Sequence, residues 1–313
     1  LGKMSNAEAA AIGCNMAFSP VCDILYNWQN TEVVNRAFGN DPERVAKMSA
    51  AYVKGAHENP GFACAAKHFP GNGQDFRDAH LSNNVNYFDV EEWDKTYGLV
   101  YKTLIENDLD AIMAGHIMLP KYAKAINPDL KDEDMMPDTL SPEIMKGLLR
   151  DKLGFNGMVV TDASHMAGMT DRMKRKDMLP RTINAGCDMF LFFNDPEEDF
   201  ATMLEAYQNG TISEERMEEA LERILGLKAH LGLHKKAKEE LVPAPEALEG
   251  VLGSQEHKDM QKAISRDSIT LVKYKDKEVL PVVPERYKRI MIVHVKGAES
   301  GMSALAKAMG MAG

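Results

Sequence analysis

The sequence has few cysteines, and none of them lies in a metal-binding or disulfide pattern. Four cysteines are spread over 313 residues, at positions 14, 22, 64 and 187, and no two form a C-x-x-C pair. Such spacing indicates neither a zinc site nor a disulfide framework. Reduced, buried thiols are typical of cytoplasmic proteins, so we expect a cytoplasmic location unless an export signal precedes Leu1.

Long apolar runs and basic stretches are also absent. No run of about 18 apolar residues occurs, which argues against a membrane span. The net charge of −10, with no dominant basic stretch, argues against a nucleic-acid partner. The sequence also has no G-x-G-x-x-G or Walker motif, which a doubly wound nucleotide-binding sheet would be expected to carry after an early strand. A hydrophobic fraction of 44% predicts an ordinary globular protein instead.

Five short apolar runs are present, and each ends in a polar residue. Stretches with a helical period lie between them, such as residues 41–58 and 91–108. This alternation predicts a parallel sheet covered by helices. Polar groups at the carboxyl ends of successive strands are typical of a (β/α)8 TIM-like barrel, with a doubly wound sheet as the less favoured alternative. The runs end at Asp23, His68, His116, Asp162 and Asn194.

The number of strands predicts an incomplete barrel. Five strong strands are visible where the fold needs eight, and the chain starts at Leu1 and not at a methionine. We therefore interpret the chain as a fragment that lacks the strands before the one ending at Asp23. The expected result is an open barrel whose inner apolar side chains face a gap, and whose isolated chain is insoluble or inactive.

We expect three parts along the chain. Residues 1–235 form the partial barrel and end in a helix over 213–233. Residues 236–256 form a charged, proline-containing linker. Residues 257–313 form the truncated start of a second α/β sandwich domain. Its expected elements are a helix over 257–265 and strands over 268–274 and 289–295.

The segment KHFPGNGQDFRDAH (67–80) carries the strongest chemical signal. An apolar strand delivers Lys67 and His68, and a proline and two glycines then force the chain into a loop. This loop ends in Asp78 and His80. An aspartate two residues before a histidine can bond one ring nitrogen and raise the basicity of the other. The alternative, on spacing alone, is an ordinary surface histidine.

A second signal is GFNGMVVTDASHMAGM (154–169). Asp162 stands where an apolar strand meets a helix. A carboxylate at such a strand end can attack an anomeric carbon and form a glycosyl-enzyme intermediate. A helix N-cap is an equally reasonable interpretation of this position when it is taken alone.

Together these segments resemble glycoside hydrolase family 3. The segments that agree, over roughly residues 13–300 and in the same order, are FSPVCD, RAFGNDPE, KHFPG-x-G, D-x-H, IMAGHI, VVTDA, AGCDMFL and SITLVK. KHFPG-x-G followed by D-x-H is specific, and the D-x-H pair is typical of the β-N-acetylglucosaminidase (β-hexosaminidase) branch. Typical β-glucosidases of the family lack this pair and take their acid/base from the second domain.

The resemblance implies a function and a set of site residues. It implies an exo-acting, retaining enzyme that removes terminal β-linked N-acetylglucosamine without a metal or cofactor. Asp162 is then the nucleophile, and Asp78 with His80 is the acid/base. Asp23, Arg36, Lys67 and His68 match positions that hold sugar hydroxyls in the family, and His116 is a further pocket residue. Carboxylate acceptors and cationic donors suit vicinal hydroxyls.

The sequence differs from the family pattern at two positions, and several alternative functions remain open. Asn72 stands where this branch commonly has a histidine, which could alter the pocket or the loop, and Ala79 replaces the usual serine of D-S-H. A β-glucosidase or a β-glycoside phosphorylase of the same family is possible, because a neutral histidine does not repel phosphate. Outside the family, the alternatives are an inactive fragment or a metal-dependent barrel hydrolase with ligands at His68, His116 and Asp162. No H-x-H or H-E-x-x-H motif supports the metal alternative. The sequence does not indicate the oligomeric state.

Overall fold

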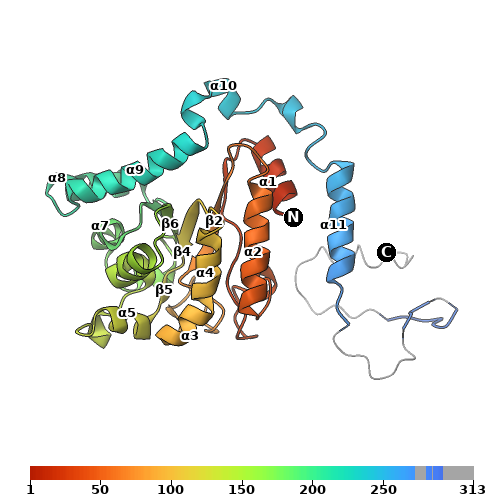
Figure 1. The fold of residues 1–313 in the computed structure, drawn as a ribbon, viewed down its shortest axis with the longest axis horizontal. Helices are drawn as coiled ribbons and strands as arrows, with labels where there is room; N and C mark the ends of the chain where they lie inside the picture. The colour runs from red at the N-terminus through yellow and green to blue at the C-terminus, as the bar shows by residue number, and fades with distance from the viewer. Residues whose placement is uncertain (272–279, 284, 292–313) are drawn as a thin grey trace. The chain divides into compact units, whose positions relative to one another are not determined.

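Five parallel strands form the main sheet of the protein (Figure 1). The computed structural model describes residues 1–271, 280–283 and 285–291, without the side chains of residues 238 and 239. The five apolar runs are confirmed as neighbouring parallel strands in chain order. The strands are β1 (Met16–Ala17), β2 (Ala63–Phe69), β4 (Ala111–Ala114), β6 (Met158–Ala163) and β7 (Met189–Leu191).

The first strand is shorter than the sequence predicts. Only two residues of its run pair with β2, and Val21 makes an isolated bridge to Lys67 further along. Pro20 explains the interruption, since it has no N–H to donate to a ladder. The small sheet of β3 (Asn84–Val85) and β5 (Ile117–Met118) was not expected.

The main sheet is a curled half-barrel. Within the described residues β1 and β7 are its two edges, so a complete eight-stranded barrel is not confirmed. The strands are nearly continuous in apolar residues because both faces of the sheet are covered. The carboxyl ends of β2, β4 and β6 reach the same edge, and this edge carries the polar groups singled out above.

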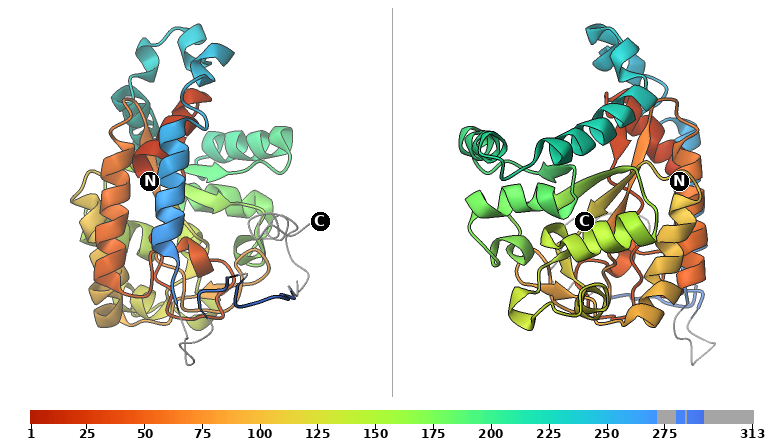
Figure 2. Two further views of the ribbon diagram at one scale, coloured as in Figure 1. Left: turned by 90° about the vertical axis from the view of Figure 1, so that its right-hand side faces the viewer. Right: turned by 60° about the vertical axis from the view of Figure 1, so that its left-hand side comes forward.

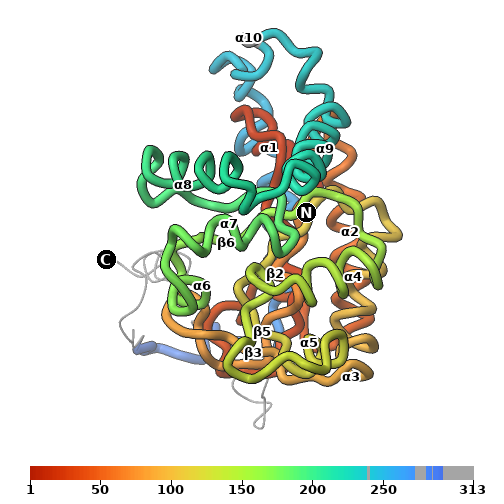
Figure 3. Tube along the Cα trace, turned by 90° about the vertical axis from the view of Figure 1, so that its left-hand side faces the viewer, coloured from red at the N-terminus to blue at the C-terminus, as the bar shows by residue number. Residues whose placement is uncertain are grey.

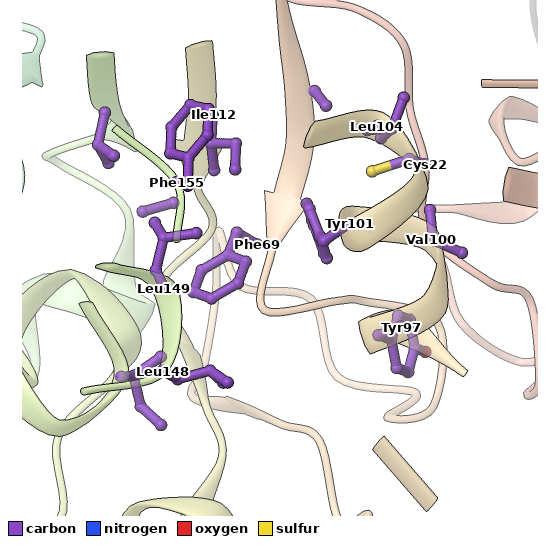
Figure 4. Close-up of a cluster of buried hydrophobic side chains, with 14 of the residues drawn as sticks. Cys22, Phe69, Tyr97, Val100, Tyr101, Leu104, Ile112, Leu148, Leu149 and Phe155 are labelled. Atoms are coloured by element: carbon purple, nitrogen blue, oxygen red, sulfur yellow. The ribbon is translucent and has the colours of Figure 1, made fainter. Parts of the chain in front are cut away.

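Two helices cover the outer face. α2 (Pro42–Ala56) and α4 (Tyr97–Ile105) lie side by side, and α2 also contacts β2 (Figures 1 and 3). The predicted helix over 91–108 is split, because Thr96 leaves helical geometry between α3 (Val90–Lys95) and α4, and its hydroxyl donates to Glu92 O at 2.6 Å. Aromatic side chains fill the core beneath these helices (Figure 4), among them Phe69, Tyr97 and Tyr101.

The middle of the inner face is covered, so the expected apolar gap is partly filled, whereas Met189 in β7 stays 38% exposed. Ala65, Met113 and Val160 point to this face and are at most 2% exposed. Ile224 and Leu227 pack against them from α9 (Glu214–His230), which lies next to β6 (Figure 2). This helix was predicted over 213–233, and Ser213 caps it by accepting a hydrogen bond from Arg216 N at 3.2 Å.

The remaining elements connect these parts. They are α1 (Gly2–Ala11), η1 (Val34–Arg36), α5 (Pro120–Ile126), η2 (Asp132–Asp134), η3 (Asp138–Leu140), the π-helical η4 (Glu143–Lys152), α6 (Ala167–Thr170), α7 (Arg175–Ala185), α8 (Pro196–Gln208), η5 (Leu233–Lys235), α10 (Lys238–Leu241), η6 (Pro245–Leu248) and α11 (Gln255–Ser268). In the described ranges no helix is long and apolar enough to cross a membrane.

The chain divides into two units, Leu1–His257 and Lys258–Gly313. The helix predicted over 257–265 is confirmed by α11. Of the two strands predicted after it, residues 269–271 and 289–291 have no regular secondary structure, and residues 272–274 and 292–295 lie outside the described residues. The sandwich domain therefore stays a prediction.

A buried carboxylate fixes α9 to the sheet. Asp188, just before β7, accepts from Val159 N at 2.9 Å and pairs with Arg150 and Arg216, each at 2.9 Å. Arg216 also donates to the carbonyl oxygens of Ile183 and Cys187, each at 2.8 Å. This network holds α9 against the half-barrel, because the Asp188 carboxylate accepts hydrogen bonds from three segments.

Substitution of Asp188 by alanine should destabilise the protein strongly. Two largely buried guanidinium groups would lose this carboxylate, and removal of one partner of a buried ion pair typically costs about 3–5 kcal/mol. Urea unfolding of Asp188→Ala should show this loss. Glu91→Ala, which removes an exposed partner of Lys95, is the control and should cause no measurable change in the unfolding free energy. Equal effects of the two substitutions would contradict the role of Asp188.

Candidate active site

Polar side chains from three of the five strands meet at the carboxyl edge of the sheet. Asp23 follows the β1 run, His68 lies in β2 and Asp162 lies in β6. Asp23 Oδ1 accepts from His68 N at 3.1 Å, and its Oδ2 lies 2.7 Å from His68 Nδ1. This contact leaves Nε2 of His68 directed at Asp162, whose Oδ2 is 3.6 Å away. The geometry thus links two predicted sugar-binding residues to the predicted nucleophile.

Asp23 is deeper than the sequence indicates. Its side chain has no exposed surface, and Oδ1 also accepts from Asn72 N at 2.8 Å. Asp23 therefore orients His68 and the start of the following loop. Direct contact of Asp23 with a sugar stays a prediction.

The surroundings of Asp162 favour its ionised form. Burial by itself raises the pKa of a carboxyl group, but nearby His68 and Lys67 and a hydrogen bond from Ala163 N outweigh burial, so the pKa of Asp162 lies below its ordinary value. Burial, assisted by the charge of Arg36, lowers the pKa of Lys67, although Asp162 opposes this shift. An ionised carboxylate beside a cation is the state that nucleophilic attack requires.

The loop after β2 brings the predicted acid/base pair together. Gly73 has a positive φ of 111°, and a Cβ there would lie 2.0 Å from Ile24 O, so only glycine permits this turn. The loop ends with His80 Nδ1 2.7 Å from Asp78 Oδ1. Burial would raise the pKa of Asp78, but hydrogen bonds from the His80 backbone and side chain prevail and lower it. Ring nitrogen Nε2 of His80 is then the one available for proton transfer.

Backbone contacts join this loop to the segment after Asp162. Gly168 N donates to Ala79 O at 2.9 Å, and Ala167 N donates to His80 O at 3.3 Å. The side chain of His80 is 60% exposed and that of Asp162 is 23% exposed, so an incoming ligand could reach both.

Arg36 and His116 both have hydrogen-bond partners within the protein. Arg36 lies in η1, is exposed, and donates from Nε to Glu32 O at 2.6 Å. His116 is fully buried, with Nε2 3.0 Å from Ala163 O and Nδ1 3.0 Å from Thr139 Oγ1. The carbonyl must accept, so Nε2 carries the proton and Nδ1 accepts from the threonine. His116 therefore supports the backbone beside Asp162, and its contact with a sugar stays a prediction.

The sequence analysis missed one residue of this edge, Glu32. Its side chain is 7% exposed, and Oε1 lies 3.4 Å from His80 Nδ1. Asn72, the departure from the family pattern, donates from Nδ2 to Glu32 Oε2 at 2.7 Å. Nothing in the spacing of the sequence singles out Glu32, because it lies in an irregular segment between two motifs.

A metal ion could be held by one group in the described part of the chain. Possible ligand atoms of Glu32, Asp78 and His80 lie within 4.8 Å of one another. The alternative predicted from His68, His116 and Asp162 finds less support, because both ring nitrogens of His116 are engaged by protein groups. Carboxylates and imidazoles at the strand ends of a curled parallel sheet are typical of the active sites of barrel enzymes.

Comparison with known proteins identifies the family. The sequence profile of the glycosyl hydrolase family 3 N-terminal domain matches residues 1–227. The chain belongs to this family. A Cellulomonas fimi protein named β-N-acetylglucosaminidase/β-glucosidase is 44% identical over 301 residues, which are 96% of this chain and 52% of that protein. β-Hexosaminidase A of Pseudoalteromonas piscicida is 30% identical over 277 residues, which are 85% of this chain and 45% of that protein.

Solved structures agree with this assignment. A β-glucoside phosphorylase, BglX, bound to 2FGlc superposes with a TM-score of 0.87 at 41% identity, over 91% of this chain and 50% of that one. A family 3 β-N-acetylglucosaminidase from Paenibacillus sp. gives a TM-score of 0.78 at 28% identity, over 88% of this chain and 50% of that one. The chain spans about half the length of these relatives.

The buried His116 makes a pH-dependent contribution to stability. Burial lowers the pKa of His116 from 6.5 to about 4, so the unfolded chain takes up a proton at a pH where the folded protein does not. Stability is therefore lost as pH falls from 6.5 towards 4. The advantage of the wild type over His116→Gln in unfolding free energy should shrink by up to about 1.4 kcal/mol per pH unit in this window. A difference that is independent of pH would contradict a neutral, buried His116.

Proposed function

We propose that the protein is a retaining exo-glycosidase that removes terminal β-linked N-acetylglucosamine. The observation that carries the proposal is the pairing of an ionised carboxylate at a strand end, Asp162, with the Asp78–His80 pair on the adjoining loop. Relatives named β-N-acetylglucosaminidase and β-hexosaminidase support the substrate class. In this function Lys67, His68 and Arg36 contact sugar hydroxyls, and Asp23 orients His68.

The reaction proceeds in two displacements. A carboxylate oxygen of Asp162 forms a bond to the anomeric carbon while the glycosidic bond breaks, and His80 gives the Nε2 proton to the departing oxygen. Water then attacks the same carbon, returns a proton to Nε2 and releases Asp162. Asp78 holds Nδ1 in both steps, so the proton always moves at Nε2.

The covalent step can be tested by trapping. A 2-fluoro-sugar with an activated leaving group should label Asp162 in the whole protein, because the fluorine slows the second displacement. Peptide mass spectrometry should find the sugar on this residue. Asp162→Ala should lose turnover of an aryl β-N-acetylglucosaminide by at least about a thousandfold, since no intermediate can form. Labelling of another carboxylate would contradict the assignment.

A second candidate is a β-glycoside phosphorylase. The similar structure named a β-glucoside phosphorylase favours it, because the match covers 91% of this chain at 41% identity. A histidine acid/base is compatible with it, since a neutral imidazole does not repel a phosphate dianion as a carboxylate does. The first displacement is the same in both candidates, and only the acceptor of the second differs.

The acceptor can be identified from the products. With inorganic phosphate added to an aryl glycoside reaction, the hydrolase proposal predicts free sugar at every phosphate concentration. Accumulation of a sugar 1-phosphate, detected by phosphorus NMR, would show that the protein is a phosphorylase and would contradict the hydrolase proposal. Comparison of N-acetylglucosaminide and glucoside substrates in the same experiment separates the two sugar classes.

A further inference from the structure

Glu32 is a buried carboxylate that the two displacements do not use. It lies just before η1, and it is 7% exposed although the neighbouring His80 is 60% exposed. Burial raises the pKa of Glu32 above its ordinary value. Burial of a carboxylate is unfavourable, so its position beside the proposed acid/base pair indicates a structural or a chemical role.

The partners of the Glu32 carboxylate come from the loop that carries the acid/base pair and from β3, just after it. Oε2 accepts from Asn72 Nδ2 at 2.7 Å and from Asn84 Nδ2 at 3.3 Å. Oε1 lies 3.4 Å from His80 Nδ1, and a backbone hydrogen bond from Ala79 also reaches this carboxylate. The carboxylate therefore gathers donors from the beginning and the end of the loop and from β3.

The segment that holds Glu32 is fixed by other contacts. Asn30 Oδ1 accepts from Glu32 N at 3.1 Å and from Val33 N at 2.7 Å. Asn30 Nδ2 donates to Asn72 Oδ1 at 2.9 Å and to Asp75 O at 2.7 Å. The two segments thus stay docked without the Glu32 side chain, which makes substitution at this position informative about His80.

Asp78 cannot by itself place His80 relative to the nucleophile. The two residues are two apart in one loop, so their hydrogen bond moves with the loop. Glu32 belongs to a different segment and approaches the same Nδ1 atom, so it opposes rotation of the imidazole and displacement of the loop. A carboxylate at this distance also stabilises the positive ring that forms whenever Nε2 takes up a proton.

We propose that Glu32 is a positioning residue of the acid/base: a second carboxylate that holds His80 from outside the loop. The inference rests on the proposed function. Its consequence is selective in kcat/KM, because this constant reports the first displacement, in which His80 acts only by protonating the leaving group. Glu32 should matter for substrates with poor leaving groups and little for activated ones.

The test compares kcat/KM for an alkyl and a dinitrophenyl β-N-acetylglucosaminide in the whole protein. Glu32→Ala should lower the alkyl-to-dinitrophenyl ratio by about 10- to 100-fold, the loss expected when a catalytic group shifts by about 1 Å. Glu32→Gln should lower it at least as much, since its amide places a donor against the Nδ1 proton. Glu32→Asp, which keeps the charge, should recover part of the ratio.

Asp75→Asn is the matched control. Asp75 binds Arg77 in the same loop and Val85 N in β3, and none of its contacts in the described residues involves His80, so its loss should affect both substrates equally. An equal loss for both substrates in the Glu32 variants, with an unfolding midpoint lowered as in Asp75→Asn, would overturn the proposal. His80→Ala distinguishes failure of the proposed function from failure of the proposed role of Glu32. If the loss of kcat/KM in His80→Ala does not depend on the leaving group, the proposed function fails. If the loss depends on the leaving group in His80→Ala but not in the Glu32 variants, only the role of Glu32 fails.

Discussion

The buried carboxylate of Asp23 is the interaction on which the site depends. It accepts hydrogen bonds from His68 N, His68 Nδ1 and Asn72 N, and so it fixes both the end of β2 and the first turn of the loop. Two series of contacts start from Asp23, one through His68 and one through Asn72. His68 is directed at Asp162, and Asn72 reaches Glu32, which in turn approaches His80. One carboxylate therefore sets the geometry of the proposed nucleophile and of the proposed acid/base together.

The cost of burying these charges explains the density of the network. An unpaired carboxylate away from water is strongly unfavourable, so each buried acid at this edge is surrounded by donors. The balance differs between them. At Asp162 the donors and cations prevail and the pKa falls, whereas at Glu32 burial prevails and the pKa rises. Two carboxylates at one edge thus have pKa values shifted in opposite directions.

The sequence predicted the strands, and the polar residues that lie together at their ends, for a physical reason. Parallel strands buried on both faces are continuous apolar runs, and their polar ends must meet at one edge, so the positions of His68 and Asp162 followed from the pattern. Glu32 could not be found in this way, because its burial arises from contacts with residues 40 to 52 positions away. The covering of the inner face by Ile224 and Leu227 is likewise tertiary. His116 was predicted as a pocket residue, but its burial against Ala163 depends on a turn that the pattern does not reveal.

The central proposal is that Asp162 and the Asp78–His80 pair act in two successive displacements at one anomeric carbon. Proton NMR of the first product formed from a β-glycoside tests it most directly, before mutarotation mixes the anomers. Two displacements at one carbon retain configuration, so the account predicts that the β-anomer of the released sugar, or of its methyl glycoside in methanol, appears first. Initial formation of the α-anomer would show a single displacement and would contradict the account.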